Sequence, residues 1–145
     1  AVIYLIAVTG MRFDECLGLT WDSVDYDNKV LIVDKTWNYK TILDFTSTKT
    51  KSSIRKIPLD DSTLEFLKKY RQVHWLENKD NRIFSNILNN AVNKTLRRIV
   101  GRNVHAHSLR HTYASFLISQ RVELLSISKI LGHENMNITI EVYAH

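Results

Sequence analysis

The feature that most constrains the fold is the period of the apolar residues, which changes twice along the chain. Residues 1–19 carry apolar side chains at helical spacing, in two stretches broken at Thr9 and Gly10. Three short β-branched segments with turn-rich borders follow: KVLIVDK, TILDFTS and SIRKIPL, at 29–35, 41–47 and 53–59. Such segments are typical of strands. Because the helical period returns after residue 60, we predict a mainly α fold with a small three-stranded antiparallel sheet, a meander of these segments.

The second half of the chain predicts helices separated by short turns. Helical spacing recurs over four segments: 60–76, 87–100, 108–120 and 123–131. Asp60, Asp61 or Ser62 can cap the first of them, and Gly132 is placed to stop the last. The expected inward stripe of the first helix is Leu64, Leu67, Tyr70, Val73 and His74. With no internal repeat or linker, residues 1–145 are expected to form one domain.

The last segment, residues 137–145, supports two conflicting predictions. Its isoleucines and valine alternate with other residues as in a strand, whereas Asn135 or Asn137 could cap a helix. The alternation taken alone favours a strand.

Composition and charge limit the class of protein. Twenty Lys and Arg against 15 Asp and Glu give a net charge of +5, which makes a polyanion a reasonable partner. The apolar run at residues 1–8 is too short to span a bilayer and lacks the flanks of a signal peptide, so we expect a cytoplasmic protein without membrane contact. Cys16, the single cysteine, is expected to be a buried, inert thiol. A start inside an apolar segment, without a cap, suggests excision from a longer protein.

The histidines of HAHSLRHTYASFL, residues 105–117, first raise the question of a metal site. His107 and His111 have the i, i+4 spacing of a zinc helix, but Ser108 stands where a hydrolytic zinc site has glutamate. No acidic residue lies between Gly101 and Gln120 to complete the ligand set. These absences argue against metal binding.

The same stretch can instead hold phosphate. A helical wheel separates two faces: Leu109, Tyr113, Phe116 and Leu117 on the apolar one, and His107, His111 and Ala114 opposite, with Arg110 at the edge. His107 and Arg110 could therefore reach one ligand together. A guanidinium donates bidentate hydrogen bonds to phosphate, and a neighbouring imidazole can donate to it or move a proton. The alternative is a basic helix start that is merely solvated.

Two further basic groups have functional and structural interpretations. Arg12 follows a Gly turn, and Glu15 one turn later can orient its guanidinium, although a surface ion pair is the alternative. Basic residues also cluster on a predicted hairpin: Lys49, Lys51, Arg55 and Lys56. This hairpin could contact a DNA groove or backbone, or could be a charged strand edge that resists aggregation.

Taken in order, five motifs resemble the catalytic domain of tyrosine recombinases, the phage integrase family. They are Arg12 in TGMRFDECLGLTW, Lys49 in TKTKSSIRKIPL, HSLR at 107–110, LGH ending at His133, and Tyr143 in ITIEVYAH. The resemblance covers essentially the whole chain and is greatest to integrases of bacterial phages and conjugative transposons. It implies the tyrosine-recombinase catalytic-domain fold, in which the segment around Tyr143 is a short helix rather than a strand.

The resemblance also implies an activity, which is cleavage and rejoining of DNA through a 3′-phosphotyrosyl bond on Tyr143. Arg12 and Arg110 would clamp the nonbridging oxygens, and the leaving 5′-oxygen would take its proton from Lys49, with Lys51 as the rival donor. The reaction would need no metal, cofactor or ATP.

Supporting roles follow from the same resemblance. His107 would transfer a proton or contact phosphate, His133 would donate a hydrogen bond to phosphate, and Glu15 would position the first arginine. Four positions are expected to contact DNA outside the reacting phosphate: Lys51, Arg55, Lys56 and His111.

The implied partners are double-stranded attachment sites, other protomers in a tetramer on DNA, and an excisionase or host DNA-bending factor. Family members generally carry an upstream DNA-binding domain. Since residues 1–145 lack one, the fragment is expected to bind DNA weakly. Three alternatives stay open: a DNA-binding module without chemistry, a metal-dependent nuclease or hydrolase that uses His107 and His111, and a type IB topoisomerase.

Overall fold

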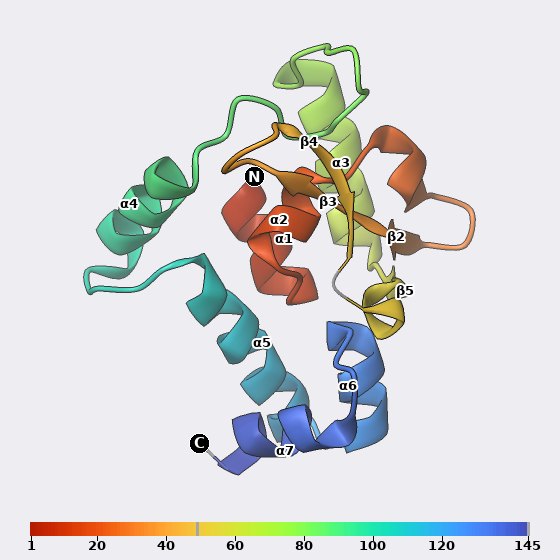
Figure 1. Cartoon of the computed structure of the whole chain (residues 1–145), viewed down its shortest axis with the longest axis vertical. Coiled ribbons are helices and arrows are strands. Elements are labelled where there is room, and N and C mark those ends of the chain that lie inside the picture. The colour runs from red at the N-terminus through yellow and green to blue at the C-terminus, as the bar shows by residue number, and fades with distance from the viewer. Residues whose placement is uncertain (49, 145) are drawn as a thin grey trace.

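The computed structural model describes residues 1–48 and 50–144, except the side chains of 142–144. In this part of the chain the elements follow in the order α1 (Val2–Thr9), α2 (Phe13–Leu17), β1 (Val24–Asp25), β2 (Val30–Val33), β3 (Lys35–Asn38), β4 (Asp44–Ser47), β5 (Arg55–Pro58), α3 (Asp61–Val73), α4 (Asn89–Val100), α5 (Ala106–Ser119), α6 (Leu124–Leu131) and α7 (Met136–Ala144) (Figure 1). Short 3-10 turns precede β1 and β5, at Trp21–Ser23 and Lys51–Ser53. The prediction of a mainly α fold with a small three-stranded antiparallel sheet is confirmed, and a second, two-stranded sheet was not predicted.

The strands form two sheets rather than one meander. The three-stranded sheet has the order β1-β2-β5, with Leu31 opposite Ile57, whereas β3 and β4 form a separate hairpin with Trp37 opposite Phe45. The prediction that segment 41–47 joins the three-stranded sheet was therefore wrong. The cause is the unpredicted strand β3, which packs on α2. A Cβ at Gly18 would lie 2.9 Å from the backbone of β3, so only glycine permits this contact.

The predicted helices are all present, and their boundaries shift by a few residues. Asp60 caps α3, its carboxylate accepting a hydrogen bond from the backbone N–H of Thr63 at 2.8 Å. Leu64 and Leu67 are buried as predicted, but Val73 and His74 are exposed. This part of the prediction was wrong because the apolar face of α3 ends one turn earlier, at Tyr70, which packs on Phe84.

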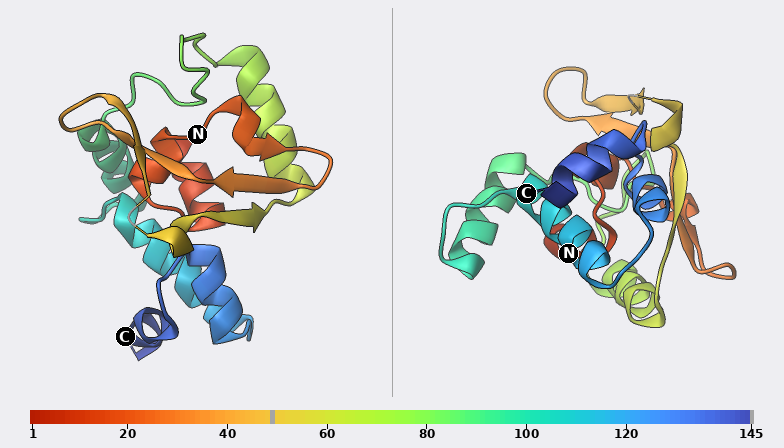
Figure 2. Two further views of the ribbon diagram at one scale, coloured as in Figure 1. Left: turned by 45° about the vertical axis from the view of Figure 1, so that its right-hand side comes forward. Right: turned by 90° about the horizontal axis from the view of Figure 1, so that it is seen from below.

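Two apolar cores of unequal size support the molecule. The larger contains buried residues of α1, α2, β2, β5 and α3, including Leu5, Leu31, Ile57 and Leu67. The smaller has four buried members: Ala114, Leu117, Ile127 and Leu131. It joins α5 to α6 at the lower end of the molecule, where α7 also lies (Figures 1 and 2). Cys16 is buried in the larger core, as predicted.

The C-terminal segment is helical. The prediction from alternation, a strand over residues 137–145, was wrong, and the helix implied by the family resemblance is confirmed up to Ala144. Asn135 Oδ1 accepts a hydrogen bond from the backbone N–H of Asn137 at 2.9 Å, at the start of the helix. Ile138 and Ile140 remain partly exposed while Thr139 points inward, so the alternation does not mark a buried strand face. No helix of the described residues is both long and apolar enough to cross a membrane.

Candidate active site

A small basic pocket lies where α5, α6 and α7 meet the start of α2. Its volume is about 150 Å³, and eight residues line it: Arg12, His107, Arg110, His111, Ala114, Leu131, His133 and Ile138. Four of the six predicted catalytic positions are thus brought together from three distant segments. Lys49 lies outside the described residues, and Tyr143 is described only as backbone within α7. A neighbouring cavity of about 250 Å³ shares Arg12, His107 and Arg110, so these groups are accessible from two sides.

Arg110 is buried and held at both ends of its guanidinium. Only 5% exposed, it donates from Nη1 to the Gly10 carbonyl and from Nη2 to the Leu131 carbonyl, each at 2.7 Å. Burial, followed by the charge of Arg12, lowers the pKa of Arg110 to about 9. A Cβ at Gly10, which has a φ of 69°, would lie 2.3 Å from the Tyr113 ring, so glycine lets α5 approach this carbonyl.

The helical wheel misplaced part of α5. Its buried line consists of Ala106, Arg110, Ala114 and Leu117, whereas Phe116 is 55% exposed. Arg110 therefore lies at the centre of the inward face and not at its edge. The wheel was wrong here because it assigned the inward face from apolar side chains alone, although two backbone carbonyls satisfy the Arg110 guanidinium inside.

Glu15 joins Arg12 to Arg55. Its carboxylate, 1% exposed, accepts from the backbone N–H of Arg12 at 2.8 Å and lies 3.5 Å from Arg12 Nη1. It also accepts two hydrogen bonds from Arg55, at 2.7 and 2.9 Å. Burial raises the pKa of Glu15, but hydrogen bonds and charge from Arg55 and Arg12 outweigh it and hold the pKa below its ordinary value. The predicted contact between Glu15 and Arg12 is confirmed, and Arg55 is an additional, stronger partner.

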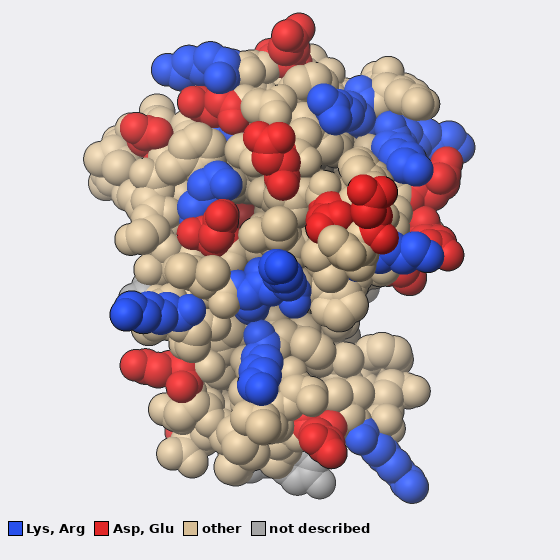
Figure 3. All heavy atoms as spheres, turned by 90° about the vertical axis from the view of Figure 1, so that its right-hand side faces the viewer, with Lys and Arg blue, Asp and Glu red and all other residues tan. Residues whose placement is uncertain are grey.

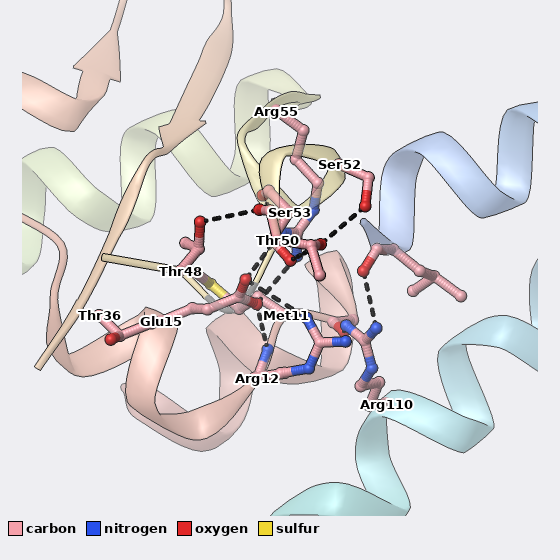
Figure 4. A network of polar contacts seen from close by, with 12 residues as sticks. Met11, Arg12, Glu15, Thr36, Thr48, Thr50, Ser52, Ser53, Arg55 and Arg110 are labelled. Carbon is pink, nitrogen blue, oxygen red and sulfur yellow. Dashed lines mark hydrogen bonds and ion pairs between the residues drawn. The ribbon is translucent and has the colours of Figure 1, made fainter. Parts of the chain in front are cut away.

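Arg55 was predicted to contact DNA, and this prediction was wrong. Its side chain, 8% exposed, donates to Glu15, to the Ser53 carbonyl and to the Ile130 carbonyl. In Figure 4 the guanidinium groups of Arg12 and Arg55 lie on either side of Glu15, and that of Arg110 points toward Arg12. Strand alternation could have shown this, because Arg55, Ile57 and Leu59 share the buried face of the β5 segment.

The histidines of the pocket have lowered pKa values. Partial burial, followed by the charges of His111 and Arg110, lowers the pKa of His107. Its ring meets that of His111 edge to face, with centroids 4.7 Å apart. Burial, followed by the charges of Arg110 and Arg12, lowers the pKa of His133 to about 4. His133 is therefore neutral at pH 7, and its Nδ1 lies 2.6 Å from Thr139 Oγ1.

The remaining predicted DNA contacts, Lys51, Lys56 and His111, are all exposed. Lys56 on β5 and Lys129 on α6 line an open depression of about 540 Å³ that also reaches His133. On this side of the molecule, acidic and basic side chains are mixed in the upper half, and the middle carries mainly Lys and Arg (Figure 3). Among the described residues, no group of three or more His, Cys, Asp or Glu side chains is placed to hold a metal ion.

Comparisons with known proteins agree with the motifs. The sequence profile of the phage integrase family matches residues 1–145. The chain is 32% identical over 176 residues to a tyrosine recombinase XerC-like protein of Caldanaerobacter subterraneus subsp. tengcongensis, covering 99% of this chain and 44% of that protein. Identity to the integrase of Staphylococcus phage L54a is also 32%, over 160 residues, covering 96% of this chain and 45% of that protein. The chain thus spans less than half the length of these relatives.

Solved structures share the fold. The Tn1549 transposon integrase, in complex with transposon right end DNA, superposes with a TM-score of 0.83 at 23% identity, over 99% of this chain and 53% of that chain. The catalytic domain of bacteriophage HP1 integrase gives a TM-score of 0.61 at 22% identity, over 99% of this chain and 72% of that chain. Because the family profile matches the whole sequence and the pocket gathers the motif residues in the same fold, the chain belongs to the phage integrase family of tyrosine recombinases.

Proposed function

We propose that the protein is a site-specific DNA recombinase that cleaves and rejoins DNA through a 3′-phosphotyrosyl intermediate on Tyr143. The reaction integrates or excises a mobile element and uses neither metal nor ATP. One observation carries the proposal: Arg12, His107, Arg110 and His133, from distant parts of the sequence, line a single pocket beside the helix that bears Tyr143.

The two arginines supply electrostatic stabilisation. In-line attack on a phosphodiester passes through a five-coordinate state whose nonbridging oxygens carry the negative charge. Arg110 is already fixed by two carbonyls and Arg12 by the Glu15 contact, so neither guanidinium has to reorganise when the charge develops. Donors fixed in this way stabilise the transition state more than the ground state.

The bond changes balance without a further reactant. The Tyr143 oxygen forms a bond to phosphorus, and the bond from phosphorus to the 5′-oxygen breaks. His107, whose pKa is lowered, is neutral at pH 7 and can accept the tyrosine proton. The 5′-oxygen takes a proton from Lys49, or from the rival Lys51. Rejoining is the reverse reaction, and the phosphotyrosyl bond conserves the energy that it needs.

The partners follow from the charge and the relatives. Exposed Lys51, Lys56 and His111 would contact the backbone of double-stranded attachment sites. In the intact protein we expect four protomers on two duplexes, an excisionase or host DNA-bending factor, and action in the bacterial cytoplasm.

The test uses the protein as its gene encodes it and a pool of nicked duplexes of random sequence, in excess chelator. A nick next to the cleaved bond lets the short product diffuse away, so the covalent complex accumulates and survives denaturing electrophoresis. We expect a complex with the wild-type protein and with the control Tyr26→Phe. Tyr143→Phe should bind the selected DNA but form no complex.

Two of the three alternatives predict another result, whereas a type IB topoisomerase would form the same covalent complex and is distinguished by relaxation of supercoils without recombination. A DNA-binding module binds but forms no complex in any variant. A metal-dependent hydrolase cleaves only without chelator and leaves no protein on the DNA. Either outcome would overturn the proposal.

The general acid can be assigned with a leaving group that needs no proton. If the bridging 5′-oxygen is replaced by sulfur, a thiolate leaves, and a thiol pKa near 8.5 makes protonation unnecessary. We expect Lys49→Ala to cleave the oxygen substrate about 10²-fold or more slower than the wild type. It should cleave the sulfur substrate at the wild-type rate. Lys51→Ala should show no such difference. The reverse pattern would assign the role to Lys51.

A further inference from the structure

A buried chain of polar groups connects α6 to α7 behind the pocket. Ser128 Oγ on α6 lies 2.5 Å from Thr139 Oγ1 on α7, and the same Thr139 oxygen lies 2.6 Å from His133 Nδ1. Ser128 is buried, and Thr139 has 0% of its surface exposed. Thr139 is moreover the one buried residue among the described side chains of α7, residues 136–141. The helix that carries Tyr143 is therefore held by a hydroxyl that also contacts a pocket histidine.

The hydrogen-bond chemistry of these groups limits their arrangement. A neutral imidazole carries one proton, on Nδ1 or on Nε2, and the other nitrogen is an acceptor. If Nδ1 carried the proton, Nε2 would offer a lone pair to a ligand, which would repel a phosphate oxygen. If Thr139 donates to Nδ1, the proton stays on Nε2, which can then donate to phosphate. The single Thr139 proton is used in this bond, so Ser128 must donate to Thr139.

We propose that Thr139 is a positioning residue that donates to His133 Nδ1 and thereby holds the Nε2–H tautomer facing the phosphate. This inference rests on the proposed function, because only a bound phosphodiester gives the Nε2 proton a use. Thr139 precedes Tyr143 by one helical turn. Docking of α7, which carries the nucleophile, and selection of the Nε2–H tautomer of His133 thus depend on the same hydrogen bond. A protomer whose α7 is displaced has neither the positioned tyrosine nor the phosphate donor.

Nuclear magnetic resonance of the chain labelled with ¹⁵N in its histidines tests the hydrogen bond without DNA. In the wild type at pH 7 we expect a protonated shift at His133 Nε2 and an unprotonated one at Nδ1. Thr139→Val keeps the shape but removes the donor, so the two tautomers should mix. Thr139→Ser should restore the wild-type shifts. Thr112→Val, the same change at an exposed helical threonine, should leave them unchanged. A proton on Nδ1 in the wild type, or unchanged shifts in Thr139→Val, would overturn the inference.

Covalent complex formation tests the functional half, on duplexes recovered from the nicked pool. We expect Thr139→Val to form the complex about tenfold more slowly, the effect of losing one hydrogen bond, with unchanged DNA affinity. Thr139→Ser should recover most of the rate. If Thr139 has a purely structural role, the rate of complex formation in both variants should follow their thermal stability and not the tautomer of His133. That result would overturn the proposal. If the wild type forms no complex at all, the proposed function fails, and the resonance experiment still decides the hydrogen bond.

Discussion

Two regions that meet at the pocket are held in different ways. The arginine network, which we define as Arg12, Glu15, Arg55 and Arg110, links elements of the larger core to the end of α6 in the smaller core. Its buried hydrogen bonds join β5 to α2 and α6, and α5 to the turn after α1. The α6–α7 segment, residues 124–144, rests on the smaller core, and Thr139 is the one buried residue among the described side chains of α7.

This difference in packing fits the role that we propose for each region. Groups that stabilise developing charge are most effective when they are fixed before the reaction. A nucleophile that must attack, release and rejoin needs a segment that opens at low free energy, and such segments have few buried contacts. Arg55 and Arg110 donate to the adjacent carbonyls of Ile130 and Leu131, so the network holds the end of α6, and α7 follows beyond the last of these contacts.

The largest expected effect comes from substitution of the two pocket arginines. The two variants should lose the same activity but different amounts of stability. Arg12→Ala and Arg110→Ala should each slow cleavage by about 10³-fold, since each removes a charged donor to the transition state. Only Arg110→Ala leaves two buried carbonyls without donors, and it should lower the free energy of unfolding by about 2 kcal/mol or more. Urea denaturation measures the difference. Equal stability losses would show that Arg110 is not fixed as described.

Glu15→Gln should be the most damaging substitution for stability within the network. It leaves the Arg55 charge buried without a full partner, which costs about 3–5 kcal/mol. Because the pKa of Glu15 is lowered on folding, its contribution is present above the ordinary value of 4.5 and is lost as pH falls through the folded pKa. Between pH 7 and pH 3 the free energy of unfolding should therefore fall more steeply for the wild type than for Glu15→Gln. Parallel curves would contradict this linkage.

Hydrogen exchange should separate the two regions directly. We expect the amides of α7 to exchange through openings that are at least about tenfold more populated than those of α1 and the first half of α5. Mass spectrometry of peptic peptides measures this. Uniform protection across residues 2–9 and 136–144 would remove the contrast on which the account rests.

The smallest effect is expected at Lys56, the neighbour of Arg55 in the sequence. Lys56 is exposed, so Lys56→Ala should leave stability unchanged and weaken DNA binding a few-fold. The slope of log affinity against log salt concentration should fall by about one. Arg55→Ala should instead destabilise the protein, because it removes the partner of buried Glu15. Fluorescence anisotropy at several salt concentrations gives the comparison. A loss of stability in Lys56→Ala would mean that the two faces of β5 are misassigned.

Much of the molecule could be predicted from local patterns. The helices follow from apolar spacing and end signals such as Gly132, which adopts the left-handed conformation at the end of α6. Arg12, His107, Arg110 and His133 could be identified because their motifs occur in a fixed order, and the structure brings them to one pocket.

What could not be predicted depends on distant contacts. Strand alternation places Arg55 on the buried face of β5, but its partner Glu15 lies 40 residues away in the sequence and has no local signal. Thr139 has no local signature at all, because its partners are Ser128 and His133. The strand β3 was missed because it is defined by pairing with β4 and packing against Gly18, and its own four residues show neither contact.

The most direct test of the account is to locate the covalent bond. The trapped complex is digested with nuclease and trypsin, and the peptide covering residues 130–145 is sequenced by mass spectrometry. We predict a nucleotide attached through its 3′-phosphate to Tyr143. An adduct on another residue, or cleaved DNA with no adduct on any peptide, would contradict the account.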